Sequence, residues 1–129
     1  MNDTNRPLIL ALSDSTGETA QQTARAGLAQ FGKFEDASVL LVSHVLNERD
    51  LEQCVKQAAA LDAMLAYTLV GPVLRGKVKE LAHKHDVLAV DLLGPLIARL
   101  STHLGEAPLY TPGLGHELDA DYFRRIEAI

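Results

Sequence analysis

A short polar segment at positions 13–19, with the sequence SDSTGET, follows the first apolar run of the chain and precedes a helical pattern. The hydroxyl groups of Ser15, Thr16 and Thr19 can donate hydrogen bonds to a ligand, and Gly17 lets the backbone approach it closely. The N–H groups at a helix N-terminus favour an anion. The segment therefore predicts a ligand loop, whose candidate site residues are Ser13, Asp14, Ser15, Thr16, Gly17 and Thr19.

The same segment also has a structural interpretation. Ser15, followed three positions later by Glu18, forms a capping-box pattern that starts a helix without any ligand. Asp14 and Glu18 suit the positive end of a helix dipole, and two carboxylates oppose a dianionic phosphate. Anion binding and helix capping both stay open at this point.

The segment departs from two familiar phosphate-binding patterns. It contains no lysine, so it is not a Walker A loop, and it does not match the three-glycine dinucleotide pattern. Thr16, Gly17 and Thr19 resemble part of the flavodoxin phosphate loop, which implies an FMN- or phosphate-binding module as an alternative. Asp14 stands where that family has a hydroxyl. The chain has no Trp, three Tyr and three Phe to stack on a flavin.

Further candidates lie where apolar runs end, because ligands of open parallel sheets bind outside the carboxyl ends of the strands. His44 ends the second run, Thr68 lies near the end of the third, and Asp91 closes the fourth. For Asp91, helix capping is an equal alternative. His116 lies in a Gly-rich tail. No Cys/His cluster has zinc spacing, so we expect no metal site.

Four continuous apolar runs and four helical patterns must position these side chains. The runs predict strands buried on both faces at 8–12, 37–44, 63–70 and 87–93. The helical patterns cover 17–31, 48–62, Leu74 to His85 and Leu96 to Leu104. Asn47 can cap the second helix, and Pro72 and Pro95 suit the first turns of the third and fourth.

This alternation of strand and helix predicts a three-layer α/β/α fold with a four-stranded parallel sheet, Rossmann-like or flavodoxin-like. We expect the strand order 2-1-3-4. Residues 1–104 form this domain, and 105–118 are a Pro/Gly-rich loop. A helix begins within 119–129 and reaches Ile129 without a cap, which predicts that the sequence continues in a longer protein.

The composition of the chain excludes several classes of protein. The 129 residues fit one domain, and 47% of them are hydrophobic, which suffices for a core. A net charge of -5 argues against nucleic acid as a partner. Cys54 is the only cysteine, which fits a reducing cytosol. No stretch is apolar for long enough to span a membrane, so we expect a cytoplasmic protein with no membrane partner.

Four segments in register resemble one family, the phosphoenolpyruvate synthase and pyruvate, phosphate dikinase regulatory proteins. The resemblance covers positions 8 to 128. The segments are Ser13 to Ala20, Tyr67 to Val70, Val90 to Pro95 and Tyr122 to Ala128.

The resemblance implies a bifunctional enzyme. One activity is an ADP-dependent kinase that phosphorylates a threonine of the target enzyme, beside its catalytic histidine, and inactivates it. The other is a phosphorylase that removes the phosphoryl group with inorganic phosphate and yields pyrophosphate. Both activities use a P-loop in the C-terminal half of the family's proteins.

The sequence has no Gly-x-x-x-x-Gly-Lys-Ser/Thr segment within its 129 residues. We therefore expect the N-terminal domain only, inactive by itself, with no catalytic residue and no bound cofactor. The opening loop is expected to face the C-terminal domain or the target. A pure interaction domain is a further alternative, and the choice between synthase and dikinase and a homodimeric assembly stay open.

Overall fold

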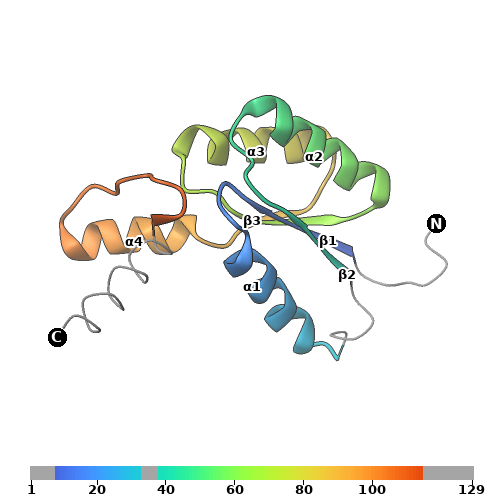
Figure 1. Ribbon diagram of the computed structural model, residues 1–129, viewed down its shortest axis with the longest axis horizontal. Helices are drawn as coiled ribbons and strands as arrows, with labels where there is room; N and C mark the ends of the chain where they lie inside the picture. Colours follow the sequence, from blue (N-terminus) through green and yellow to red (C-terminus); the bar gives the residue numbers. More distant parts are fainter. Residues whose placement is uncertain (1–7, 33–37, 115–129) are drawn as a thin grey trace, which may run out of the picture.

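The computed structural model describes residues 8–32 and 38–114, in which strands and helices alternate as predicted (Figure 1). The predicted helix that begins within 119–129, and His116, lie outside these residues. The elements are β1 (Leu8–Ser13), α1 (Glu18–Ala29), β2 (Ser38–Val42), α2 (Glu48–Leu61), β3 (Met64–Thr68), α3 (Pro72–Lys84), β4 (Ala89–Asp91) and α4 (Gly94–Leu104).

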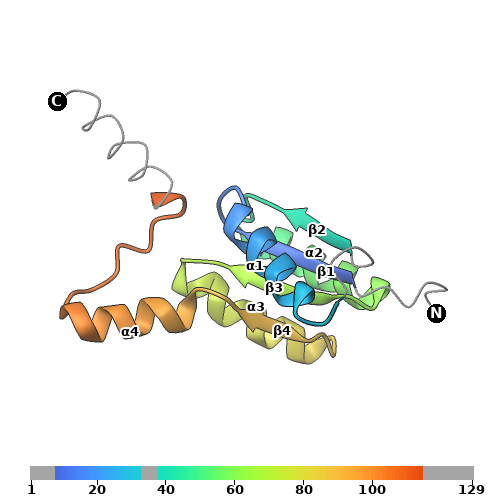
Figure 2. The same ribbon diagram turned by 90° about the horizontal axis from the view of Figure 1, so that it is seen from below.

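The strands form one parallel sheet in the order β2-β1-β3-β4, which confirms the predicted order. Leu10 of β1 pairs with Leu40 of β2 and with Leu65 of β3, so β1 and β3 are the central strands. Helix α1 covers one face of the sheet, and α2 and α3 cover the other (Figures 1 and 2). The three-layer α/β fold of Rossmann-like kind is confirmed.

The larger part of the core lies between the sheet and the α2–α3 layer. Alternate residues of the central strands point to this side, among them Leu10 and Leu65, which are fully buried against Leu51 and Val55 of α2. A smaller cluster on the opposite face packs Ile9 and its neighbours under α1. Both faces of β1 and β3 are therefore covered, as their continuous apolar runs predict.

Helix starts agree with the sequence in α2, α3 and α4 but not in α1. The Asn47 side chain accepts a hydrogen bond from the Asp50 N–H at 2.8 Å, so the predicted cap is confirmed. Pro72 and Pro95 lie in the first turns of α3 and α4. The capping box of Ser15 and Glu18 is wrong, because the N-cap of α1 is Gly17 and it makes no side-chain cap hydrogen bond.

The reason for this correction is the backbone of the opening loop. Gly17 adopts a left-handed φ of 87°, which turns the chain just before the helix and leaves Ser15 outside its first turn. The hydroxyl oxygens of the loop accept hydrogen bonds from N–H groups only two residues away instead. Ser13 Oγ accepts from Ser15 N at 2.9 Å, and Thr16 Oγ1 accepts from Glu18 N at 3.5 Å.

The prediction that all four strands are buried on both faces is wrong for the outer two. Leu40 and Leu41 of β2 are 43% and 42% exposed, and Val90 of β4 is 39% exposed. Both strands lie at the edges of the sheet, and β4 has only three residues. An apolar run predicts burial only where neighbouring strands and helices supply it.

Helix α4 does not pack on either face of the sheet. It extends past the carboxyl ends of the strands, and residues 105–114 then run back toward the end of β1 (Figures 1 and 2). No helix in the described part of the chain combines the length and the apolar character needed to cross a membrane.

Candidate functional site

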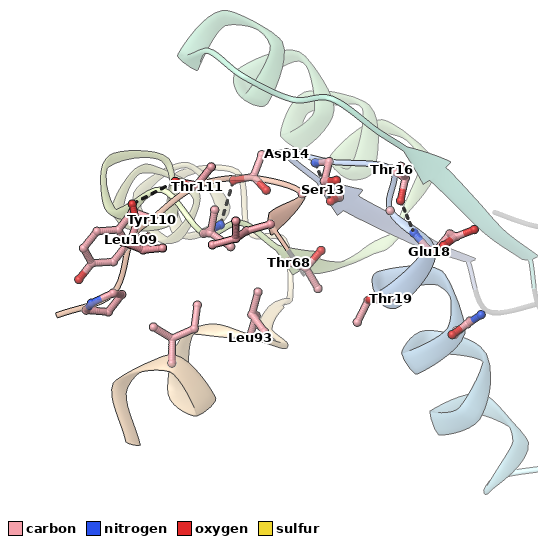
Figure 3. Close-up of a pocket in the computed structure, with 18 residues that line it drawn as sticks. Ser13, Asp14, Thr16, Glu18, Thr19, Thr68, Leu93, Leu109, Tyr110 and Thr111 are labelled. Atoms are coloured by element: carbon pink, nitrogen blue, oxygen red, sulfur yellow. Dashed lines mark hydrogen bonds between the residues drawn. The ribbon is translucent and has the colours of Figure 1, made fainter. Parts of the chain in front are cut away.

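A cavity of about 600 Å³ opens at the carboxyl ends of β1 and β3 (Figure 3). Four parts of the chain enclose it: the opening loop with the start of α1, the end of β3 with Val70, the beginning of α4, and the returning chain at 108–111 and 113–114. All six residues predicted for the opening loop line this cavity. They are Ser13, Asp14, Ser15, Thr16, Gly17 and Thr19.

Backbone hydrogen bonds hold the opening loop in place. The Ser15 carbonyl accepts from His44 N at 2.9 Å, and the Ser13 carbonyl accepts from Val45 N at 2.9 Å. At Gly17 an added Cβ would collide with the Leu41 side chain. The loop is thereby fastened to the end of β2, which gives the cavity a defined wall.

Asp14 is a buried structural carboxylate, only 4% exposed. One of its oxygens accepts a hydrogen bond from Val70 N at 2.9 Å (Figure 3). The same oxygen accepts a second from Gly71 N at 3.4 Å, at the turn that begins α3. The negative charge lies at a helix N-terminus, where it is favourable. Asp14 therefore joins the β1 loop to the β3 loop.

Asp91, at the end of β4, also accepts two backbone N–H groups at the start of a helix, but within its own turn. Its Oδ1 accepts from Leu93 N at 3.1 Å and from Gly94 N at 2.7 Å, the N-cap residue and the first residue of α4. It lines a separate cavity of about 400 Å³ beside Arg75 and Lys79, not the main one. Asp91 therefore satisfies backbone N–H groups at the start of α4, and its ligand role stays a prediction.

The remaining strand-end candidates differ in whether they line the main cavity. Thr68 is 6% exposed and faces the main cavity from the end of β3 (Figure 3). His44 is exposed, has a left-handed φ of 57° and touches the opening loop through its backbone, but does not line the cavity. His116 lies outside the described residues.

The returning chain is a part of the site that sequence reasoning missed. Gly113 lies against the opening loop, since an added Cβ would be 3.1 Å from Ser15 Oγ. The ring of Tyr110 lies 5.9 Å from the Arg75 guanidinium carbon, a cation–π contact. The high Pro and Gly content of positions 105–118 predicted a loop, but gave no signal of which surface the loop would touch.

The lining is rich in hydroxyl groups and poor in positive charge. Thr16, Thr19 and Thr68 present hydroxyls to the cavity, and Glu18 adds a carboxylate. No lysine, arginine or histidine is among the residues of the described ranges that line it. Among these residues a phosphate dianion would meet hydroxyls, the N–H groups at the start of α1 and the Glu18 carboxylate, but no side-chain cation.

Two further observations bear on cofactors. Tyr110 is the single aromatic residue that lines the cavity within the described residues, which gives a flavin ring little to stack on. Residues 8–32 and 38–114 contain no group of three or more His, Cys, Asp or Glu side chains arranged to hold a metal ion.

Burial changes the acidity of two side chains near the site. Tyr67 packs in the core below the cavity, and burial, reinforced by Asp91 and opposed by Arg75, raises its pKa to about 12. Burial, with a smaller contribution from Asp50, also raises the pKa of the Cys54 thiol. Neither group is poised to react at neutral pH.

The fold and the cavity together define a Rossmann-like α/β domain with its candidate ligand site at the carboxyl edge of the sheet. The sequence model of the kinase/pyrophosphorylase family matches residues 9–129, and the chain belongs to this family.

The chain is also similar to proteins provisionally named pyruvate, phosphate dikinase regulatory proteins. It is 46% identical over 121 residues to one from Pelobacter propionicus, covering 94% of this chain and 43% of the relative. It is 45% identical to one from Trichlorobacter lovleyi, with 94% and 45% covered. It is 39% identical to one from Halothermothrix orenii, with 98% and 47% covered. The chain therefore spans about half the length of these relatives.

Proposed function

We propose that this chain is the N-terminal part of a cytoplasmic regulator of pyruvate, phosphate dikinase or phosphoenolpyruvate synthase. The observation that carries the proposal is the family match over residues 9–129, which includes the whole opening loop and every residue that lines the cavity. The names of the relatives support a dikinase as the target.

The full-length protein would catalyse two phosphoryl transfers, one that phosphorylates the target and one that removes the phosphoryl group. In the first, a threonine hydroxyl of the target attacks the terminal phosphorus of ADP, the bond to the bridging oxygen breaks, and AMP leaves. In the second, an oxygen of inorganic phosphate attacks the phosphorus of the phosphothreonine and forms pyrophosphate, the bond from phosphorus to the threonine oxygen breaks, and that oxygen takes up a proton to restore the hydroxyl. ADP and inorganic phosphate are thus substrates of the full-length protein.

Phosphoryl transfer depends on positioned cations that stabilise the negative charge of the transferring group. The cavity lining supplies hydroxyls and two carboxylates but no cation within the described residues. We infer that this part of the protein does not transfer phosphate by itself. Its opening loop contacts the C-terminal half or the target threonine segment, and the hydroxyls position that partner.

A chimera tests this proposal. Residues 9–129 of this chain replace the matched segment of the Pelobacter propionicus relative, and the loss and recovery of dikinase activity are followed with ADP and with inorganic phosphate. We expect Thr16→Val and Thr19→Val to lower both rates about tenfold, because each removes a hydroxyl from the cavity.

The matched control is Thr102→Val, an exposed threonine on α4 outside the cavity. Unchanged rates in the Thr16 and Thr19 variants would remove the opening loop from the mechanism. A folded chimera that neither inactivates nor reactivates the dikinase or the synthase would overturn the proposed function itself.

A further inference from the structure

Helix α4 carries apolar side chains that the described structure leaves uncovered. Leu96, Leu100 and Leu104 are 55%, 43% and 61% exposed, and Ile97 is partly buried. Residues three and four positions apart lie on one side of a helix, so these four side chains form one surface, named the α4 stripe.

Helix α2 shows what a covered apolar stripe looks like in the same structure. In α2, Leu51, Cys54, Val55 and Ala58 are all at most 7% exposed. In α4 the one buried residue is Gly94. Contiguous exposed apolar surface marks a site of interaction. The α4 stripe is therefore suited to contact another part of a larger assembly.

The described part of the chain ends at the cavity that one residue of the α4 stripe also lines. After α4 the chain turns at Gly105, which has a left-handed φ of 67°, and runs back toward the sheet (Figure 1). Leu114, the last described residue, lines the same cavity as Ile97 of the α4 stripe. The described chain thus ends at the wall of a cavity to which α4 also contributes.

We propose that the α4 stripe is the docking surface for the C-terminal half of the full-length protein, in the same polypeptide. The relatives are about twice as long as the segment they share with this chain. The proposal rests on the proposed function in taking the full-length protein to have their length. It adds which surface joins the two halves.

A tethered partner fits this surface better than a second copy of the chain. A stable interface between separate proteins buries about 1,200–2,000 Å² and must offset lost translational freedom, whereas the stripe consists of four side chains. A covalently linked partner binds at high effective concentration and needs less area. The titratable residues of α4 are Arg99 and His103, so the partner surface is apolar with carboxylates at its rim.

Thiol labelling of the chimera defined above tests the surface directly. Leu100→Cys is placed in the chimera and in the 129-residue chain, and its rate of reaction with a maleimide is measured in both. We expect labelling about tenfold slower in the chimera, because the docked half covers position 100. The native Cys54 is buried and its pKa is raised, so it contributes a slow background.

Thr102→Cys is the matched control, since two residues along a helix place it on the opposite side from Leu100. Its labelling rate is expected to be the same in both proteins. Equal rates for Leu100→Cys in the two proteins would overturn the proposal. Protection of Leu100→Cys in the 129-residue chain that grows with its concentration would also overturn it, and would assign the surface to a second copy.

The two proposals fail separately. Protection at position 100 in a chimera without dikinase-regulating activity would leave the docking surface standing and remove the proposed function. Full regulating activity of the chimera without protection at position 100 would support the proposed function and remove the docking surface.

Discussion

At the scale of single residues, the carboxylates of this domain hold loops together. Asp14 and Asp91 each accept two backbone N–H groups at the start of a helix, and Asp14 does so across 56 positions of sequence. These bonds set the shape of the carboxyl edge of the sheet, on which the cavity depends.

Replacing Asp14 by Ala tests this role. The Val70 and Gly71 N–H groups would lose their acceptor in a buried setting, so we expect a loss of about 1–3 kcal/mol of unfolding free energy. Urea denaturation of the 129-residue chain measures it. Glu18→Ala, an exposed carboxylate of the same segment, should change stability by about 0.5 kcal/mol or less. Equal losses in both variants would contradict the anchoring role.

Tyr67 gives a prediction about pH. Its pKa is raised from 10.0 to about 12 by burial first and by Asp91 second, with Arg75 opposing. The folded chain holds the phenol proton more tightly than the unfolded chain, so unfolding releases it between these values. Stability therefore falls as pH rises from 10.0 toward about 12.

The measurement is urea denaturation across this pH range, with an ultraviolet difference titration of the phenol. Tyr67→Phe should lose this part of the pH dependence, because it has no phenol to ionise. The titration curve of Tyr67→Phe, subtracted from that of the unaltered chain, isolates the Tyr67 phenol. A pKa at the ordinary value of tyrosine in this difference would contradict the prediction and show that Tyr67 is accessible to water.

At the scale of elements, the start of α1 decides where the opening loop lies. Its N-cap is a glycine with a left-handed backbone, whereas α2 begins at an Asn side-chain cap. The difference lets the chain turn sharply between the end of β1 and α1, so that Thr16 and Thr19 both reach the cavity.

Gly17→Ala should destabilise the chain by about 1–3 kcal/mol, because the left-handed conformation is unfavourable for a residue with a Cβ. Gly27→Ala is the matched control within α1, since nothing lies within 4 Å of its added Cβ. That change should stabilise the helix by roughly 0.5–1 kcal/mol. Thermal and urea unfolding measure the stability of both variants. If the two substitutions changed the stability in the same direction, the special role of the Gly17 backbone would be refuted.

At the scale of the whole molecule, the described structure is a four-stranded sheet with covered central strands and a helix, α4, that stays largely uncovered. Both central strands are buried, but α4 lies beyond the sheet and its leucines are exposed. The chain spans about half the length of the relatives it matches.

The 129-residue chain alone should transfer no phosphate from ADP to the dikinase. Its sequence has no P-loop motif, and the cavity lacks a cation among its described lining residues. Incubation with ADP labelled in its terminal phosphate, followed by detection of phosphothreonine, measures this, and the chimera is the positive control. Detectable transfer by the 129-residue chain would place the catalytic machinery within it.

The sequence predicts where the cavity lies in the fold, but not all of the residues that line it. Topology alone places the opening loop and Thr68 at one edge of a parallel sheet, and both line the cavity. The capping box at Ser15 failed, because local spacing does not reveal that Gly17 turns the backbone before the helix. Nothing in the residue types of 108–114 indicates that this segment would close the cavity.

The sequence by itself determined the order of elements, the parallel sheet and the burial of β1 and β3. These follow from apolar periodicity, turn residues and the handedness of crossovers, which act over short stretches of chain. The tertiary structure alone decided that Asp14 binds the Val70–Gly71 turn and that α4 leaves its stripe uncovered. Such features depend on contacts between segments far apart in the chain, which no local pattern encodes.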